Sequence, residues 1–205
     1  MRTALLTVAV FLGAGAVAAE EKAEAPSWSW SLSGTQYWLP NEPDFLLGVG
    51  IAKRDRLHLE TRWQYEDLRS LSVFAGYTFS AGETVHVEAT PIAGPLLGRT
   101  TGLIPGLELT VGWRWLTFYT EDEYVFDLGD SSANFFYTWT ELTATPVEFL
   151  TVGIVGQRTR EVHTSVDIQR GLLARATYGP VTLGVYVFNI GTSDWYLLTG
   201  ITIAH

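Results

Sequence analysis

The chain has 205 residues, a formal net charge of −9 and no cysteine. The lack of cysteine excludes disulfides, thiolate catalysis, cysteine-ligated metal and a lipidated cysteine, and the negative charge argues against a nucleic-acid partner because the two would repel each other. Aromatic residues make up 13% of the chain, and glycine occurs 20 times but methionine once. This composition favours a β-rich fold with many tight turns.

Residues 1–19 have the pattern of a secretory signal peptide. Arg2 provides a positive start, residues 4–12 form an apolar run too short to span a bilayer, and the small residues at 16–19 supply a cleavage site. The charged stretch 20–26 is expected to be a flexible periplasmic leader. After the signal peptide, no apolar run reaches the roughly eighteen residues that a spanning helix needs. A membrane location therefore has to come from strands.

Residues 27–205 show alternating runs separated by turn signals at intervals of about ten to fifteen residues. Tight connections are expected at 53–55, 80–82, 146–147 and 179–180, and longer ones at 94–105, 128–133 and 189–194. The longer ones follow odd-numbered strands, as expected if the first strand leaves the periplasm. The predicted strands are 27–38, 44–54, 56–66, 69–79, 83–93, 106–114, 116–127, 134–145, 148–159, 163–178, 181–188 and 195–204.

The segment LHLETRWQYE, residues 57–66, alternates strictly between apolar and polar positions. In a strand, all its charges would lie on one face. A soluble sheet would need lysine-rich outer faces, yet only Lys22 and Lys53 follow the signal peptide. We therefore expect the charges to point into a barrel and lipid to cover the apolar faces. The uncharged faces assigned to lipid are Phe45, Leu47, Val49 and Ile51, and Val181, Leu183, Val185 and Val187.

Tryptophan and tyrosine cluster near strand ends, for example Trp28, Trp63, Trp113 and Trp195. Their rings prefer the headgroup level of a bilayer, so paired aromatic bands are typical of a lipid-embedded barrel. The alternative is that these rings fill a soluble core.

The closing segment, WYLLTGITIAH, has an apolar face that runs back by twos from His205 to Trp195. It resembles the C-terminal strand of bacterial outer-membrane β-barrel proteins, in which the last residue is usually Phe or Trp rather than histidine. The segments 123–127, 135–142 and 167–171 are similar to stretches of outer-membrane proteins of unknown role. The resemblance implies an outer-membrane location, with outer-membrane lipid and the barrel-assembly machinery as partners.

A three-residue turn at 53–55 would place Gly48 opposite Glu60 and, over the next two hairpins, Glu60 about 10 Å from His86. In the inward set, carboxylates outnumber guanidinium groups, and the excess has to be solvated, protonated or neutralised by cations. We therefore expect some water in the lumen. The residues predicted to line it are Glu60, Arg62, Glu66, His86, Glu88, Glu108, Glu121, Glu123, Asp127, Glu141, Asp167 and Arg175.

Arg170 does not fit this scheme, because it falls on the outward face if Asp167 and Gln169 point inward. An arginine facing lipid at mid-depth costs about 2 to 4 kcal/mol. We expect a β-bulge at Gly171 that turns Arg170 inward. Regular pairing through 168–172 would contradict this expectation.

The sequence predicts an all-β protein: one closed antiparallel up-and-down transmembrane barrel of about twelve strands. The leading function is a narrow porin-like channel for small cationic or neutral solutes. The first alternative is a closed structural or binding barrel with a charge-paired interior. The second is an outer-membrane lipid-modifying enzyme, although no serine–histidine pair falls on the outward face. We expect no cofactor, no catalytic residues and no metal site, since the alternating pairs His58, Glu60 and His86, Glu88 are only a weak metal signal.

Overall fold

The computed structural model describes residues 27–161 and 167–205. The predicted signal peptide and leader lie outside the described residues, and so does the start of the predicted strand 163–178. The described residues contain one short 3-10 helix, η1 (Ser131–Ala133), and no helix long and apolar enough to cross a membrane.

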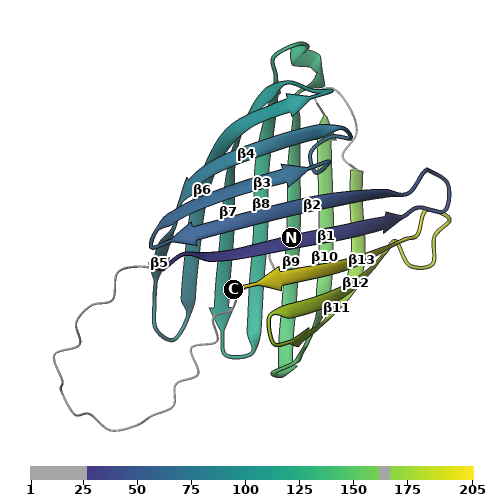
Figure 1. The fold of residues 1–205 in the computed structure, drawn as a ribbon. Coiled ribbons are helices and arrows are strands. Elements are labelled where there is room, and N and C mark those ends of the chain that lie inside the picture. Colours follow the sequence, from purple (N-terminus) through teal and green to yellow (C-terminus); the bar gives the residue numbers. More distant parts are fainter. Residues whose placement is uncertain (1–26, 162–166) are drawn as a thin grey trace, which may run out of the picture.

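The remaining secondary structure is a series of antiparallel strands (Figure 1). Two of them, β8 and β12, have the predicted bounds. The strands are β1 (Ser29–Trp38), β2 (Phe45–Arg54), β3 (Leu57–Trp63), β4 (Ser70–Tyr77), β5 (Phe79–Ala81), β6 (His86–Gly98), β7 (Gly102–Trp113), β8 (Leu116–Asp127), β9 (Phe135–Val147), β10 (Leu150–Glu161), β11 (Asp167–Tyr178), β12 (Val181–Phe188) and β13 (Tyr196–Ala204).

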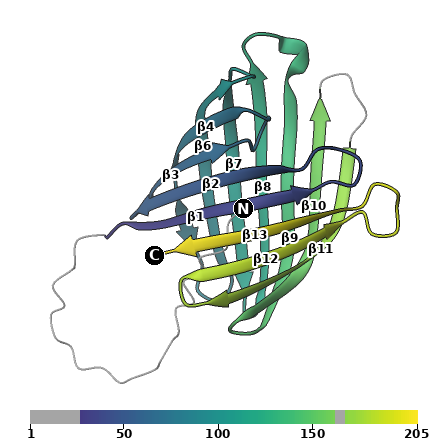
Figure 2. The same ribbon diagram turned by 45° about the vertical axis from the view of Figure 1, so that its right-hand side comes forward.

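The strands close into a barrel. Consecutive strands pair with each other except β4 and β5, which both pair with β6, and β1 pairs with β13 (Figure 2). Strands β4 and β5 are separated only by Thr78, and both pair with β6, so they are two parts of one crossing strand. The thirteen segments therefore make the twelve-stranded closed barrel that the sequence predicts. Closure leaves no sheet edge with unpaired backbone groups.

The two ends of the barrel differ. At one end, which we call the turn end, the strands are joined by short turns such as 55–56, 114–115, 148–149 and 179–180. At the other, the loop end, the connections include 39–44, 64–69, 128–134 and 189–195. The turn end also holds the start of β1 and the end of β13, where Trp30 and His205 exchange two backbone hydrogen bonds of 2.9 Å.

Side chains alternate between the two faces of the barrel wall, as strand geometry requires. The outward face of β12 and β13 is apolar and exposed, for example Leu183 at 57% and Ile201 at 47%. The inward residues between them, such as Leu198, are fully buried. The predicted outward assignment of β12 and of the closing strand is confirmed.

The predicted outward assignment of β2 is wrong. Leu47, Val49 and Ile51 are buried inside the barrel, at 8% exposure or less. The turn at Asp55 has two residues rather than three, so Ile51 and not Gly48 lies opposite Glu60. A one-residue change in a turn moves a whole strand face from one side of the sheet to the other.

The expected long loop at 94–105 is also wrong, because β6 and β7 run through most of it. Proline cannot donate a hydrogen bond to a sheet ladder, so the two prolines at 94–105 need positions without such a bond. Pro95 lies where the pairing of β4 with β6 is interrupted, and Pro105 lies where the pairing of β7 with β8 is interrupted. Each missing N–H therefore falls at a gap in the ladder.

The predicted bulge at Gly171 is wrong, because β10 and β11 pair in unbroken register from 167 to 176. Arg170 is exposed on the outward face, opposite Gly156. It lies near the loop end of β11, where its backbone exchanges hydrogen bonds with Asn189. The cost of an outward arginine falls to about 0 to 1 kcal/mol near a membrane interface, so no bulge is needed.

Candidate functional site

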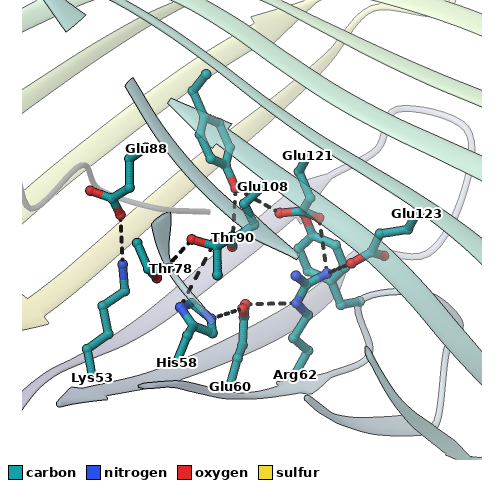
Figure 3. Close-up of polar contacts among 12 residues, drawn as sticks. Lys53, His58, Glu60, Arg62, Thr78, Glu88, Thr90, Glu108, Glu121 and Glu123 are labelled. Carbon is teal, nitrogen blue, oxygen red and sulfur yellow. Dashed lines mark hydrogen bonds and ion pairs between the residues drawn. The ribbon is translucent and has the colours of Figure 1, made fainter. Parts of the chain in front are cut away.

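The interior is organised around Arg62 on β3 (Figure 3). Its Nε donates to Glu60 at 2.8 Å, and its Nη1 donates to Glu121 at 3.0 Å and to Glu123 at 2.5 Å. Nη1 also lies 3.6 Å from a carboxylate oxygen of Glu66. A single guanidinium group thus holds four carboxylates, and we call these five residues the Arg62 cluster.

Aromatic rings hold this arginine on two sides. The guanidinium carbon lies 4.6 Å from the ring centres of both Tyr65 and Phe74, within cation–π range. The Tyr65 hydroxyl donates to Glu121 at 2.9 Å. The position of Arg62 is therefore fixed by packing as well as by charge.

Glu66 lies just beyond β3, in the 64–69 connection at the loop end. The Ser72 hydroxyl lies 2.7 and 2.8 Å from its two carboxylate oxygens. Burial raises the pKa of Glu66 above its ordinary value, although Arg62 and Ser72 act to lower it.

Next to the Arg62 cluster, on the turn-end side, His58 lies between two carboxylates. Its Nε2 lies 2.9 Å from Glu60, and its Nδ1 lies 4.0 Å from Glu108. The donor atoms of His58, Glu60 and Glu108 all lie within 4.8 Å of one another, which is close enough to hold a metal ion. The Tyr119 hydroxyl donates to Glu121 at 3.0 Å and lies 3.5 Å from Glu108, so it links the two groups.

This part of the interior is strongly acidic and shielded from water. Five carboxylates, from Glu60, Glu66, Glu108, Glu121 and Glu123, surround one arginine and one histidine. Their side chains are at most 2% exposed. Charges held in a dry interior need compensation, so the excess carboxylates have to retain protons or attract cations.

A second ion pair lies elsewhere on the inner wall. Arg175 on β11 donates to Glu141 on β9. The Trp139 indole donates to the same carboxylate at 3.0 Å, and the Tyr186 hydroxyl lies 3.5 Å from it. Here one carboxylate meets one guanidinium group, so the charges balance.

The turn end carries a third, more exposed group. Lys53 donates to Glu88 at 3.3 Å, and His86 lies 3.9 Å from the same carboxylate. The His86 side chain is 53% exposed. The expected approach of His86 to Glu60 is therefore wrong, and His58 occupies that position instead.

The predicted lumen residues thus divide into several sets. Asp127 lies at the loop end, where its carboxylate accepts hydrogen bonds from the backbone of Gly129 and Asp130, so it stabilises a turn. Asp167 pairs with Thr159 through the backbone, and its side chain lies outside the described residues. Glu88 and His86 form the turn-end group. The residues that lie inside are Glu60, Arg62, Glu66, Glu108, Glu121, Glu123, Glu141 and Arg175.

Sequence reasoning missed the aromatic partners of these carboxylates. Tyr65, Tyr119, Trp139 and Tyr186 all contribute hydroxyl or indole groups to the interior network. Tyr119 and Trp139 have the same parity along their strands as Glu121 and Glu141, and that parity was the signal that could have identified them. Tyr65 lies beyond the end of β3 and Tyr186 lies on a strand without a carboxylate, so no local pattern pointed to these two.

The interior contains less water-accessible space than the sequence suggested. Besides the charge network, it holds apolar side chains packed against one another in two larger groups. The first comprises Tyr119, Trp139, Val155, Leu173, Tyr186, Phe188, Tyr196 and Leu198, and the second Phe74, Ile92, Leu96, Ile104 and Val125. The members of both groups are at most 6% exposed, so water has little access to them.

Neither a protein-family model nor a curated protein matches the sequence. Solved structures of similar shape were found. The KdgM porin has a TM-score of 0.62 and 16% sequence identity, over 85% of this chain and 99% of that one. The NanC porin has a TM-score of 0.55 and 12% identity, over 85% and 98%. At such identities the likeness concerns the fold alone, so the chain has the closed β-barrel fold seen in these outer-membrane porins.

Proposed function

We propose that this protein is a narrow porin-like channel of the bacterial outer membrane, used by small cationic or neutral solutes and closed at rest by the Arg62 cluster. The excess of carboxylates over bases in that cluster carries the proposal. A constriction with this charge attracts cations and repels anions. One solved KdgM structure is a complex with oligogalacturonate, an acidic sugar; the acidic interior described here favours solutes of the opposite charge.

The proposed path has a polar entrance at the turn end, which we place on the periplasmic side. There the inward residues of several strands carry small hydroxyl groups, including Thr145 and Thr151, whose side chains lie 3.0 Å apart, and Thr177 and Thr182, also 3.0 Å apart. These side chains are small and already hydrogen-bonded. Passage beyond them requires the Arg62 side chain to move away from its carboxylates.

A permanently closed barrel is the second candidate, and a specific observation favours it. The side chains of Arg62 and Glu123 are 0% exposed. Such complete burial fits a network whose sole role is to make the barrel rigid. The enzyme alternative has less support. His58 lies inside the barrel against Glu60, and His86 lies at the turn end, so neither occupies the lipid face.

Planar-bilayer recording tests the proposal. Under a potassium chloride gradient, the purified protein should give small, brief current steps whose reversal potential shows a preference for potassium. The variant Glu121→Gln should weaken this preference, whereas Glu42→Gln, in an exposed loop, should leave it unchanged. A folded wild-type barrel that passes no current would support the permanently closed barrel instead, and a preference for chloride would exclude the proposed selectivity.

A further inference from the structure

A polar patch interrupts the apolar outer face of the barrel on β8, β9, β10 and β11. Asp122 lies between the inward residues Glu121 and Glu123, so its side chain points outward. Arg158 and Arg170 are exposed on the same outer face. The patch, which we call the outer-wall patch, consists of Thr120, Asp122, Thr138, Thr140, Arg158 and Arg170.

Strand pairing places these residues in two adjacent rows. In one row, Asp122 on β8 pairs with Thr138 on β9, and Thr138 pairs with Arg158 on β10. The second row runs from Thr120 through Thr140 and Gly156 to Arg170. Residues opposite each other in an antiparallel sheet share a face, so each row is continuous.

Hydroxyl groups hold the Asp122 carboxylate in place on this face. Thr138 donates to it at 2.9 Å and Thr120 at 3.1 Å, and the Thr120 and Thr140 hydroxyls lie 3.2 Å apart. The carboxylate is only half-buried, so it is left facing outward.

The outer-wall patch is surrounded by side chains suited to lipid. Leu107 on β7 pairs with Asp122 and flanks the patch on one side, and the paired row of Leu142, Ile154 and Leu172 borders it towards the turn end; all four are at least 40% exposed. The Tyr124 and Phe126 rings, 4.6 Å apart, lie between Asp122 and the loop end of β8. Asp122 is therefore inside the apolar belt, where an ionised side chain is costly and usually has a specific partner.

We propose that the outer-wall patch is the interface between two copies of this chain lying side by side in the membrane, with Asp122 of each copy paired to Arg158 of the other. The proposal rests on the membrane location proposed above, but not on the channel activity.

The arrangement of charges suits a two-fold interface. Two copies inserted in the same direction are related by an axis along the membrane normal, and such an interface is self-complementary. Asp122 and Arg158 lie on opposite sides of Thr138 in one row. An axis passing near Thr138 therefore places Asp122 of one copy opposite Arg158 of the other, and the reverse pair forms at the same time.

The distances are compatible with this pairing. Because strands are about 4.8 Å apart and tilted by about 40°, the two positions differ in depth by about 6 Å. An extended arginine side chain can cover this difference. Gly156 and the threonines also have small side chains, which lets the backbones of the two copies approach closely.

The absence of cysteine in the chain makes a direct test possible. Thr138→Cys, reconstituted in phospholipid vesicles and oxidised, should form a disulfide-linked dimer on a non-reducing gel. Thr61→Cys is the matched control, because Thr61 is an exposed threonine on β3, on the far wall of the barrel. We expect the dimer fraction of Thr138→Cys to exceed that of the control severalfold.

Charge exchange makes the test specific. In the Thr138→Cys background, Asp122→Arg alone and Arg158→Asp alone should each reduce cross-linking to the level of the control. The double variant Asp122→Arg, Arg158→Asp should restore it. Thr140→Cys provides a second cross-linking position in case Thr138→Cys does not fold.

Several outcomes would overturn the proposal. These are equal cross-linking at positions 138 and 61, no cross-linking in folded vesicle-bound barrels, or cross-linking that Asp122→Arg leaves unchanged. In the second case, the arginines would be expected to bind lipid phosphate instead. A chain that stays in solution and does not enter vesicles would instead refute the membrane location.

Discussion

Arg62 on β3 donates a 2.5 Å hydrogen bond to Glu123 on β8, although β4, β6 and β7 lie between these two strands in the barrel wall. The contact therefore crosses the interior instead of following the sheet. It joins parts of the wall that lie on either side of the pairing of β4 with β6.

The first prediction concerns the stability that this contact provides. Arg62→Ala should reduce the free energy of unfolding by about 3–5 kcal/mol, because it leaves several buried carboxylates without their cation. Arg62→Lys should cost less, since it keeps the charge but loses the fork of donors. Urea titration of the barrel in lipid vesicles measures both effects. Arg56→Ala, at an exposed turn, is the control and should change little; equal effects at positions 56 and 62 would contradict the account.

The second ion pair allows a double-mutant cycle. Arg175→Met should be strongly destabilising, because Glu141 then remains buried as an unpaired charge. Adding Glu141→Gln should recover much of the lost stability, since no uncompensated charge is left. The same vesicle unfolding measurement applies. Additive effects of the two substitutions would show that the pair is not coupled.

Close packing between β4 and β6 predicts the effect of a single methyl group. A Cβ atom at Gly94 would lie 1.8 Å from the carbonyl oxygen of Val73 on β4, so β4 and β6 could not keep their spacing. Gly94→Ala should therefore impair assembly, seen as a smaller folded fraction on unheated gels. Gly34→Ala is the matched control, because no heavy atom lies within 4 Å of the corresponding position. Normal assembly of Gly94→Ala would refute this description of the packing between β4 and β6.

A salt bridge between two loop-end connections predicts a pH dependence. Arg99 donates two hydrogen bonds to Asp67, and the Thr100 hydroxyl donates one at 2.8 Å. Partial burial alone would raise the pKa of Asp67, but these partners outweigh it and lower the pKa below its ordinary value. The contact therefore stabilises the loops above the unfolded pKa of about 3.9, and this contribution is lost as the pH falls through the lower, folded value.

Asp67→Asn should remove this contribution. At neutral pH its loops should be cut faster by protease added outside intact vesicles, whereas wild type should reach a similar rate only in strong acid. Because a protease active at neutral pH does not cut in strong acid, hydrogen exchange of the loop backbone measures the loss of loop protection in wild type there. Glu42→Gln, in the 39–44 connection, is the control. Equal loop protection in wild type and Asp67→Asn at neutral pH would exclude a role for the salt bridge.

Much of the architecture could be predicted from local pattern. The alternation in β3 placed Glu60 and Arg62 inside, and the same reasoning placed Glu121 and Glu123 inside, because parity along a strand decides the face without any knowledge of its partners. The twelve strands followed from recurring turns in the same way.

The errors arose where the outcome depends on more than one strand. Leu47 and Val49 were assigned to lipid because both faces of β2 are uncharged from Phe45 to Ala52, so only the turn length could decide between them. The contact of Arg62 with Glu123 depends on closure and on the stagger of four intervening strand pairs, which no local pattern contains. Pro95 and Pro105 could be placed in strands only once the gaps in their neighbours' ladders were known.

The most direct test of the account is the single-channel current of Arg62→Ala compared with wild type in planar bilayers. If the Arg62 cluster closes the barrel, removal of its central cation should give larger and longer cation-selective currents than wild type. Correctly folded Arg62→Ala barrels with the same current as wild type, or with none, would contradict the claim that this cluster closes a conducting path.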